Sequence, residues 1–202
     1  MIPLEQPSPG AQQVEHHSEA IDAAIERVVS GDKQAYAIII REYEKKIYTY
    51  CYCILKSREG AEDAVQEIFL KAYQNLSRYE KQASLLTWLY KIAYFHCVDL
   101  IRKQSRWHRL LSLCKERLYL SAPTYVNYTE QAVNEMLMHL NWEERNILLL
   151  RVVEQYSFEE IGTIMGCKPA TLRQRFARLR KKLINQRIQE GGAANGEVAE
   201  RT

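Results

Sequence analysis

Residues 157–183, with the sequence SFEEIGTIMGCKPATLRQRFARLRKKL, decide the fold because they predict two short helices joined by a three-residue turn. Ser157 can cap the first helix, and Gly166 favours the backbone conformation that ends it. Pro169 suits the first position of the second helix, where its missing N–H would have no partner anyway. This spacing is typical of a helix-turn-helix.

A helical wheel divides the second predicted helix into an apolar side and a polar side. The apolar side holds Leu172, Phe176, Leu179 and Leu183. On the polar side, Gln174 and Arg178 can pair with adenine and guanine edges in a major groove, and the flanking basic residues can reach phosphates. We therefore predict contacts with duplex DNA by Lys168, Ala170, Thr171, Arg173, Gln174, Ala177, Arg178 and Lys181.

Charge is distributed unevenly along the 202-residue chain, although its net value is only +3. Residues 168–187 hold eight basic residues and no acid, which points to a localised contact with a polyanion. Residues 1–30 hold five acids and one base. A subsidiary hypothesis is that this acidic segment lies against the basic helix and masks it.

The composition excludes several classes of protein. With 47% hydrophobic and 26% charged residues, the chain can bury a core, which excludes a wholly disordered protein. No apolar run approaches the roughly 20 residues of a membrane-spanning helix, and residues 1–10 lack the pattern of a secretory signal. We therefore expect a soluble protein of the cytoplasm.

The five cysteines, at positions 51, 53, 97, 114 and 167, have neither the paired spacing of a zinc site nor the even count of a disulfide framework. We interpret them as buried or inert thiols, with a redox or metal role as the alternative. The sequence indicates no metal ion and no cofactor.

The N-terminal half contains a second informative helix, over residues 61–76. Its apolar residues recur at spacings of three and one, which puts them on one face. The opposite, polar face consists of Glu62, Asp63, Gln66 and Glu67. A polar segment at 77–84 follows, and then a helix over 85–103 whose apolar side is predicted to hold Trp88, Ile92 and Phe95.

Two blocks of this sequence resemble the extracytoplasmic-function sigma factors, the smallest members of the bacterial sigma-70 family. The first comprises AEDAVQEIFLKAYQNLSRY (61–79), TWLYKIAY (87–94) and VDLIRK (98–103). The second is LNWEERNILLLRVVEQYSFEEIGTIMGCKPATLRQRFARLRKKL (140–183). The blocks occur in the family's order, and the resemblance extends over roughly residues 30–106 and 130–187, about two-thirds of the chain, so it is specific.

The resemblance implies an initiation factor of RNA polymerase and not an enzyme. Such a protein binds core polymerase at its β′ coiled coil and β flap. It recognises the −35 and −10 promoter elements and promotes promoter opening, often for stress or envelope-response genes. It also implies an anti-sigma factor as partner, which in this family is often anchored in the membrane. We expect no small-molecule substrate and a monomer when the chain is free.

The resemblance also assigns residues to these tasks. The face formed by Glu62, Asp63, Gln66 and Glu67 would bind the polymerase coiled coil. The segment after it would capture the −10 element, since polar and aromatic groups beside cations hold unstacked strands. The residues expected to contact the −10 element are, in this segment, Arg78, Tyr79, Lys81, Gln82 and Ser84 and, further along the next helix, His96, Arg102 and Lys103.

The expected fold class is all-α, with two small helical domains joined by a flexible linker and a helix-turn-helix in the second. We predict a flexible N-terminal extension at 1–18 and a region 2-like domain at 19–106. A linker at 107–129, with at most one short helix at 109–118, leads to a region 4-like domain at 130–187. A disordered tail at 188–202 completes the chain.

Two other function classes are less well supported. A stand-alone helix-turn-helix regulator would need a dimer to span two half-sites, and the sequence has no obvious dimer helix. An enzyme would need a recognisable catalytic motif, and none is present. Within the family, the chain departs from the usual pattern at Phe95, His96 and 80–84, all within the part expected to read the −10 element.

Overall fold

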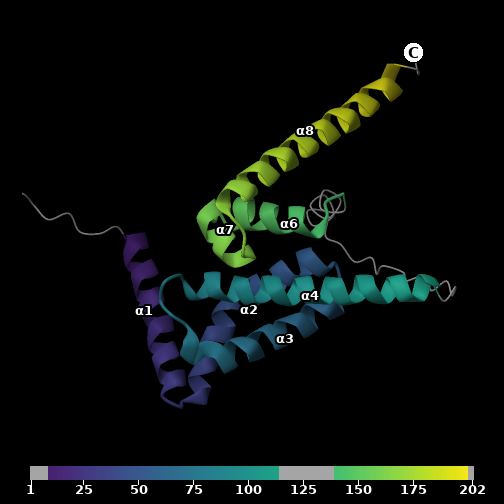
Figure 1. The fold of residues 1–202 in the computed structure, drawn as a ribbon. Helices are drawn as coiled ribbons and strands as arrows, with labels where there is room; N and C mark the ends of the chain where they lie inside the picture. Colours follow the sequence, from purple (N-terminus) through teal and green to yellow (C-terminus); the bar gives the residue numbers. More distant parts are fainter. Residues whose placement is uncertain (1–8, 114–138, 200–202) are drawn as a thin grey trace, which may run out of the picture. The chain divides into compact units, whose positions relative to one another are not determined.

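The computed structural model describes residues 9–113 and 139–199, and their side chains over 19–106 and 139–185. Every element in these ranges is a helix, as Figure 1 shows, which confirms the all-α prediction. The chain divides into two compact units, with the change from first to second between His96 and Cys97. The short stretch Cys53–Leu55 is grouped with the second unit. No helix in the described residues is long and apolar enough to cross a membrane.

The first unit is built from α1 (Pro9–Val29), α2 (Tyr36–Leu55), α3 (Arg58–Asn75) and the start of α4 (Leu85–Leu113). Short 3-10 turns, Lys33–Ala35 and Leu76–Arg78, precede α2 and follow α3. The buried side chains of α3 are the predicted apolar stripe: Ala61, Ala64, Val65, Ile68, Phe69 and Ala72.

Local sequence explains where α2 and α3 begin and end. Asp32 caps the 3-10 turn before α2 by accepting hydrogen bonds from two backbone N–H groups. Lys56, in the left-handed region at φ 54°, ends α2. The Ser57 hydroxyl then accepts a hydrogen bond from the Gly60 N–H at 3.0 Å and so caps α3.

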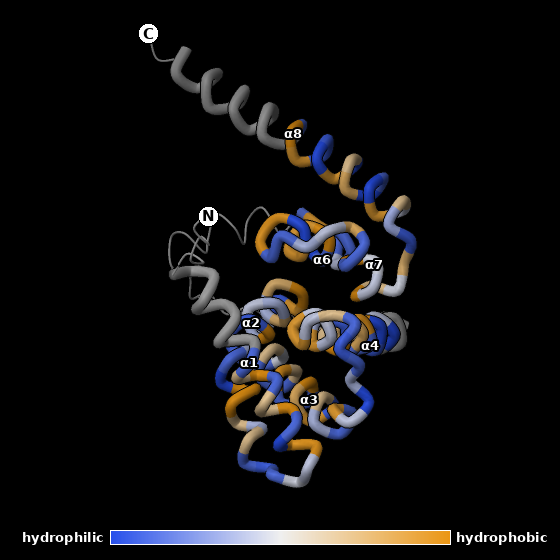
Figure 2. Tube along the Cα trace, turned by 90° about the vertical axis from the view of Figure 1, so that its left-hand side faces the viewer, coloured by the Kyte–Doolittle hydropathy of each residue, from blue (hydrophilic) through white to orange (hydrophobic). Residues whose placement is uncertain are grey.

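The second unit contains α6 (Trp142–Leu148), a π-helical turn (Leu149–Val153), α7 (Phe158–Met165) and α8 (Pro169–Ala199). Asn141 with Glu144, and Ser157 with Glu160, form capping boxes at the starts of α6 and α7. In Figure 2, hydrophobic and hydrophilic stretches alternate along the first turns of α8, as expected for a helix with one buried side.

The helix boundaries differ from the prediction at three places. α1 begins at Pro9, inside the segment 1–18 that was expected to be irregular. α4 continues to Leu113, and α8 continues to Ala199. No proline interrupts these segments after Pro9, so nothing in them forces the helices to end earlier. Residues 1–8, 114–138 and 200–202, with most of the predicted linker, lie outside the described residues.

The apolar side predicted for α4 was also wrong by about one position. Phe95 is 46% exposed, and Trp88 and Ile92 are only half-buried. The buried stripe instead consists of Leu85, Leu89, Tyr90, Ala93, Tyr94, Cys97 and Val98. Aromatic residues on both sides of α4 blurred its periodicity, so the contact with α2, marked by the Tyr50–Tyr90 ring pair at 5.1 Å, decided which side is buried.

Candidate nucleic-acid interface

The helix-turn-helix has the predicted geometry. α7 ends at Met165, Gly166 adopts the left-handed conformation at φ 66°, and Pro169 starts α8. The turn packs closely against α7. A Cβ on Gly162 would lie only 2.7 Å from the carbonyl oxygen of Cys167, so only glycine fits there. The sequence pattern showed Gly166 but gave no indication of the second required glycine.

The core of the helix-turn-helix fixes the rotation of α8 about its axis. Leu172 and Leu179 are fully buried, with exposed fractions of 0% and 2%. Phe176 is half-buried, and its ring meets that of Phe158 at 5.7 Å in an edge-to-face pair. The apolar side predicted from the wheel is therefore confirmed.

The opposite side of α8 is exposed over its described length. Of the residues predicted to contact DNA, Thr171 alone is half-buried; the exposed ones are Lys168, Ala170, Arg173, Gln174, Ala177, Arg178 and Lys181. Lys168, Arg178 and Lys181 make no ion pair within the described residues. They are accordingly the basic groups best placed to meet a polyanion.

Three basic residues on the flanks of α8 already have acidic partners. Arg173 pairs with Glu159 of α7. From α6, Glu143 pairs with Arg175 at 3.2 Å and Glu144 pairs with Lys182 at 2.8 Å. The basic segment that has no acid in its own sequence thus receives three from neighbouring helices, which reduces the charge available to phosphates.

The acidic face of α3 is exposed as predicted. Glu62, Asp63, Gln66 and Glu67 all point away from the core, and Glu62 accepts a hydrogen bond from Arg58 at 3.0 Å. A groove of about 490 Å³ runs beside this face and shares Gln66 with it. Its lining, which the sequence pattern did not indicate, is largely apolar: Lys33, Tyr36, Ile40, Glu44, Val65, Gln66, Phe69, Leu70 and Tyr73.

The residues predicted to meet the −10 element differ in whether their side chains already have partners within the chain. Ser84 caps α4, because its Oγ accepts from the Thr87 N–H at 3.2 Å and bonds the Thr87 hydroxyl at 2.8 Å. The Tyr79 hydroxyl donates to the Ala83 carbonyl at 2.6 Å, and its ring packs on Trp88 at 5.4 Å. These two side chains therefore hold the loop in shape.

The cations of this region are also partly engaged. Lys81 pairs with Asp22 at 3.4 Å and lies 3.7 Å from Glu26, both on α1. The Lys71 ammonium lies 2.7 Å from His96 Nδ1, which links α3 to α4. Arg78, Arg102 and Lys103 are exposed, and the exposed Gln82 side chain donates to Glu80 at 2.8 Å.

Two acidic residues of the N-terminal segment have partners within the first unit, and the hypothesis that this segment masks the basic helix stays a prediction. Asp22 and Glu26, both on α1, make ion pairs with Lys81 of the 77–84 segment. The physical reason is that α1 packs into the first unit through Ile21, Ala24 and Ile25, which directs its acids toward that loop.

Within the described residues, no group of three or more His, Cys, Asp or Glu side chains is arranged to hold a metal ion. The Cys51 and Cys97 side chains are buried. Cys167, in the turn of the helix-turn-helix, is half-buried, and burial raises the pKa of its thiol, which makes the reactive thiolate less available at neutral pH.

Comparison with known proteins agrees with this geometry. The family model for sigma-70 region 2 matches residues 39–106, and that for sigma-70, region 4 matches residues 130–183. The chain therefore belongs to the sigma-70 family of RNA polymerase initiation factors, and its region 4 contains the helix-turn-helix. It contributes binding, not enzymatic chemistry, to transcription initiation.

Its relatives place it in the ECF group of that family. It is 29% identical to the ECF RNA polymerase sigma factor SigW of Bacillus subtilis, over 82% of this chain and 96% of that protein. It is 29% identical to the RNA polymerase sigma-H factor of Pseudomonas aeruginosa, over 79% and 89%. The protein is thus an ECF-type sigma factor, with region 2 and region 4 domains that bind core polymerase and promoter DNA.

Solved structures agree on the fold. The sigma factor RpoE of Bartonella quintana, in complex with the anti-sigma factor NepR, superposes with a TM-score of 0.62 at 21% identity, over 73% of this chain and 93% of that one. CnrH, in complex with the cytosolic domain of CnrY, gives a TM-score of 0.61 at 18% identity, over 83% and 96%.

Proposed function

We propose that the acidic face of α3, together with the adjacent groove, is the surface that binds core RNA polymerase. The observation that carries this is their juxtaposition: Asp63, Gln66 and Glu67 stand exposed beside a largely apolar groove that includes Leu70, itself 50% exposed. An exposed acidic row beside an apolar trough suits a helical partner with basic and apolar residues on one face. The family implies a helical partner, the β′ coiled coil, and the proposal requires basic and apolar residues on its docking face.

The polar side of α8 is proposed to read the −35 duplex. An α-helix about 10–12 Å wide fits a major groove about 12 Å wide, and Ala170 and Ala177 leave room for close approach. Gln174 and Arg178 are assigned to base edges, and Lys168 and Lys181 to phosphates, because all four are exposed. Arg173 lies on the flank of α8, paired with Glu159.

The exposed cations Arg78, Arg102 and Lys103 are proposed to contact the −10 element, and so are Gln82 and His96. Ser84 and Tyr79, whose polar atoms bond their own chain, support the loop. Lys81 is proposed to act only after exchanging its carboxylate partners for phosphate.

Further parts of the proposal come from the family. We infer a cytoplasmic protein that is a monomer when free and serves stress or envelope-response genes. An anti-sigma factor, of the kind present in the two solved complexes named above, would cover its polymerase-binding surfaces.

The test is co-purification of the purified chain with core RNA polymerase. The variant D63R/E67R should lose stoichiometric binding, because like charges placed opposite one another cost several kcal/mol. The matched variant E19R/E26R makes the same change in charge on α1 and should still bind. Equal loss in both variants would show an effect of net charge, and full binding by D63R/E67R would overturn the assignment of α3.

A further inference from the structure

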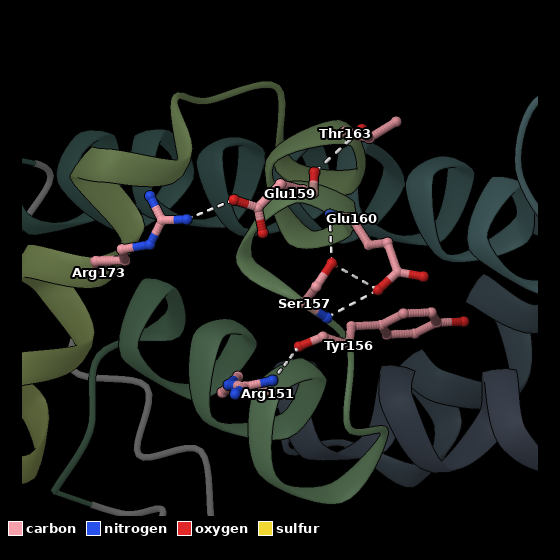
Figure 3. Close-up of polar contacts among 7 residues, drawn as sticks. All are labelled: Arg151, Tyr156, Ser157, Glu159, Glu160, Thr163 and Arg173. Carbon is pink, nitrogen blue, oxygen red and sulfur yellow. Dashed lines mark hydrogen bonds and ion pairs between the residues drawn. The ribbon is translucent and has the colours of Figure 1, made fainter.

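The contact between Glu159 and Arg173 joins the two helices of the helix-turn-helix. Figure 3 shows the two side chains pointing toward one another, with the Glu159 carboxylate accepting a hydrogen bond from the Arg173 guanidinium. The same guanidinium lies over the Phe158 ring at 5.7 Å, and Phe158 packs edge-to-face on Phe176. Arg173 is therefore held by an ion pair and by an aromatic ring that the core itself fixes.

Glu159 is not needed to cap its own helix. The capping box of α7 is complete without it: the Ser157 hydroxyl accepts from the Glu160 N–H at 3.2 Å, and Glu160 accepts from the Ser157 N–H at 2.8 Å. Figure 3 shows Glu160 turned toward Ser157 and Glu159 turned toward Arg173. The specific contact made by the Glu159 side chain is thus with a residue of the DNA-reading helix.

Arg173 remains accessible in spite of these contacts. Its side chain is 54% exposed, against 39% for Arg175 and 39% for Lys182, the other paired bases of α8. It is the fifth residue of α8, near the end that a recognition helix presents to base edges. A guanidinium has five N–H donors in a rigid fork, so the donors not used by Glu159 remain for a ligand.

We propose that Glu159 is a positioning residue that orients Arg173 for a bidentate contact with a guanine in the −35 duplex. An arginine fixed before binding loses less side-chain entropy on binding than a free one. The fixed fork also favours two parallel hydrogen bonds to guanine over a loose contact with phosphate. The proposal rests on α8 reading the −35 duplex.

The experiment uses the full chain assembled with core polymerase and a set of promoter fragments, each substituted at one −35 base pair. R173A should lose discrimination at one guanine-containing pair by about 5- to 140-fold in relative affinity. E159Q should lose about 1.4- to 5-fold at that same pair, the range for coupling through an exposed ion pair. In the R173A background, E159Q should cause no further loss there.

E143Q is the matched control, because it removes a carboxylate that pairs with Arg175. It should leave the base preference at the Arg173 position unchanged. If E143Q and E159Q change preference alike, the effect is one of domain stability and the inference fails. It also fails if E159Q raises affinity for all sequences and leaves base preference intact, since Glu159 would then only repel phosphate.

Failure of the underlying assignment looks different. If neither R173A nor R178A changes any −35 preference, α8 does not read the duplex and the proposed function of this helix is wrong. If R178A alters preference and E159Q does not, only the positioning role of Glu159 is overturned. Circular dichroism of each variant checks that the fold is retained.

Discussion

The two regions proposed to contact DNA differ in how their polar side chains are used. On α8, the outward residues Gln174, Arg178 and Lys181 are exposed and make no hydrogen bond or ion pair within the described residues. In the segment leading into α4, Ser84 and Lys81 are engaged by their own chain. A surface on one helix can therefore be inferred from periodicity. A surface built from a loop and several helices depends on which of its polar groups are already bonded within the chain.

The difference matches the two tasks. Reading a duplex requires a rigid helix whose exposed side meets a regular groove. Capturing an unpaired strand requires a shaped loop, and shaping a loop consumes polar groups as caps and turns. The Tyr79 hydroxyl and the Ser84 hydroxyl, predicted to touch DNA, are used in this way.

The largest effect is expected from R178A, which tests the assignment of α8. Loss of a bidentate contact should cost about 1–3 kcal/mol at selected −35 positions. R175A is the matched control, because it removes a guanidinium that is already paired with Glu143. It should not alter the affinity at the same promoter positions. Binding of the sigma–polymerase complex to single-substituted promoters measures both. Uniform weakening across all sequences would assign Arg178 to a phosphate contact. The two regions would then differ less in how they are proposed to contact DNA.

An intermediate effect is expected at Ser84, which tests whether the −10 segment uses this residue for shape. S84A should lower the free energy of unfolding by about 1 kcal/mol through loss of the cap of α4. S84N, which keeps a capping acceptor, should restore the stability and the rate of promoter opening. Denaturant unfolding and permanganate reactivity of the melted strand measure these two quantities. Normal stability with defective opening in S84N would show a direct contact with DNA instead.

The smallest effect concerns Glu144, which joins α6 to α8. Partial burial raises the pKa of this carboxyl. The hydrogen bonds from Lys182 and the Asn141 backbone together lower it by more than burial raises it, so its pKa lies below the usual 4.5. The folded state therefore gains stability above the unfolded pKa and loses it as the pH falls through the folded value. The contribution should be at most about 1 kcal/mol, because the pair is partly exposed.

Denaturant unfolding of E144Q between pH 7 and pH 3 measures this contribution. The difference in unfolding free energy from the wild type should be largest at neutral pH and should shrink as the pH falls below about 4.5. K182Q should show the same loss of pH dependence. A difference that is the same at every pH would show that ionisation of Glu144 does not contribute to stability.

Much of the second unit followed from sequence because its signals are local. Ser157, Gly166 and Pro169 act within one helical turn of their own positions, and each appears in the structure with the predicted role. The polar and apolar sides of α8 likewise follow from its 3.6-residue period. The acidic face of α3 was predictable for the same reason.

Tertiary structure alone decided which charges meet and which side of α4 is buried. The pairs of Arg173 with Glu159 and of Lys81 with Asp22 join residues on different elements. The exposure of Phe95, the groove lined by Phe69 and Leu70, and the turn that requires Gly162 are likewise results of packing. Sequence determined these local helices and their ends because capping and periodicity act over a few residues, whereas ion pairs and grooves depend on how separate helices pack against one another.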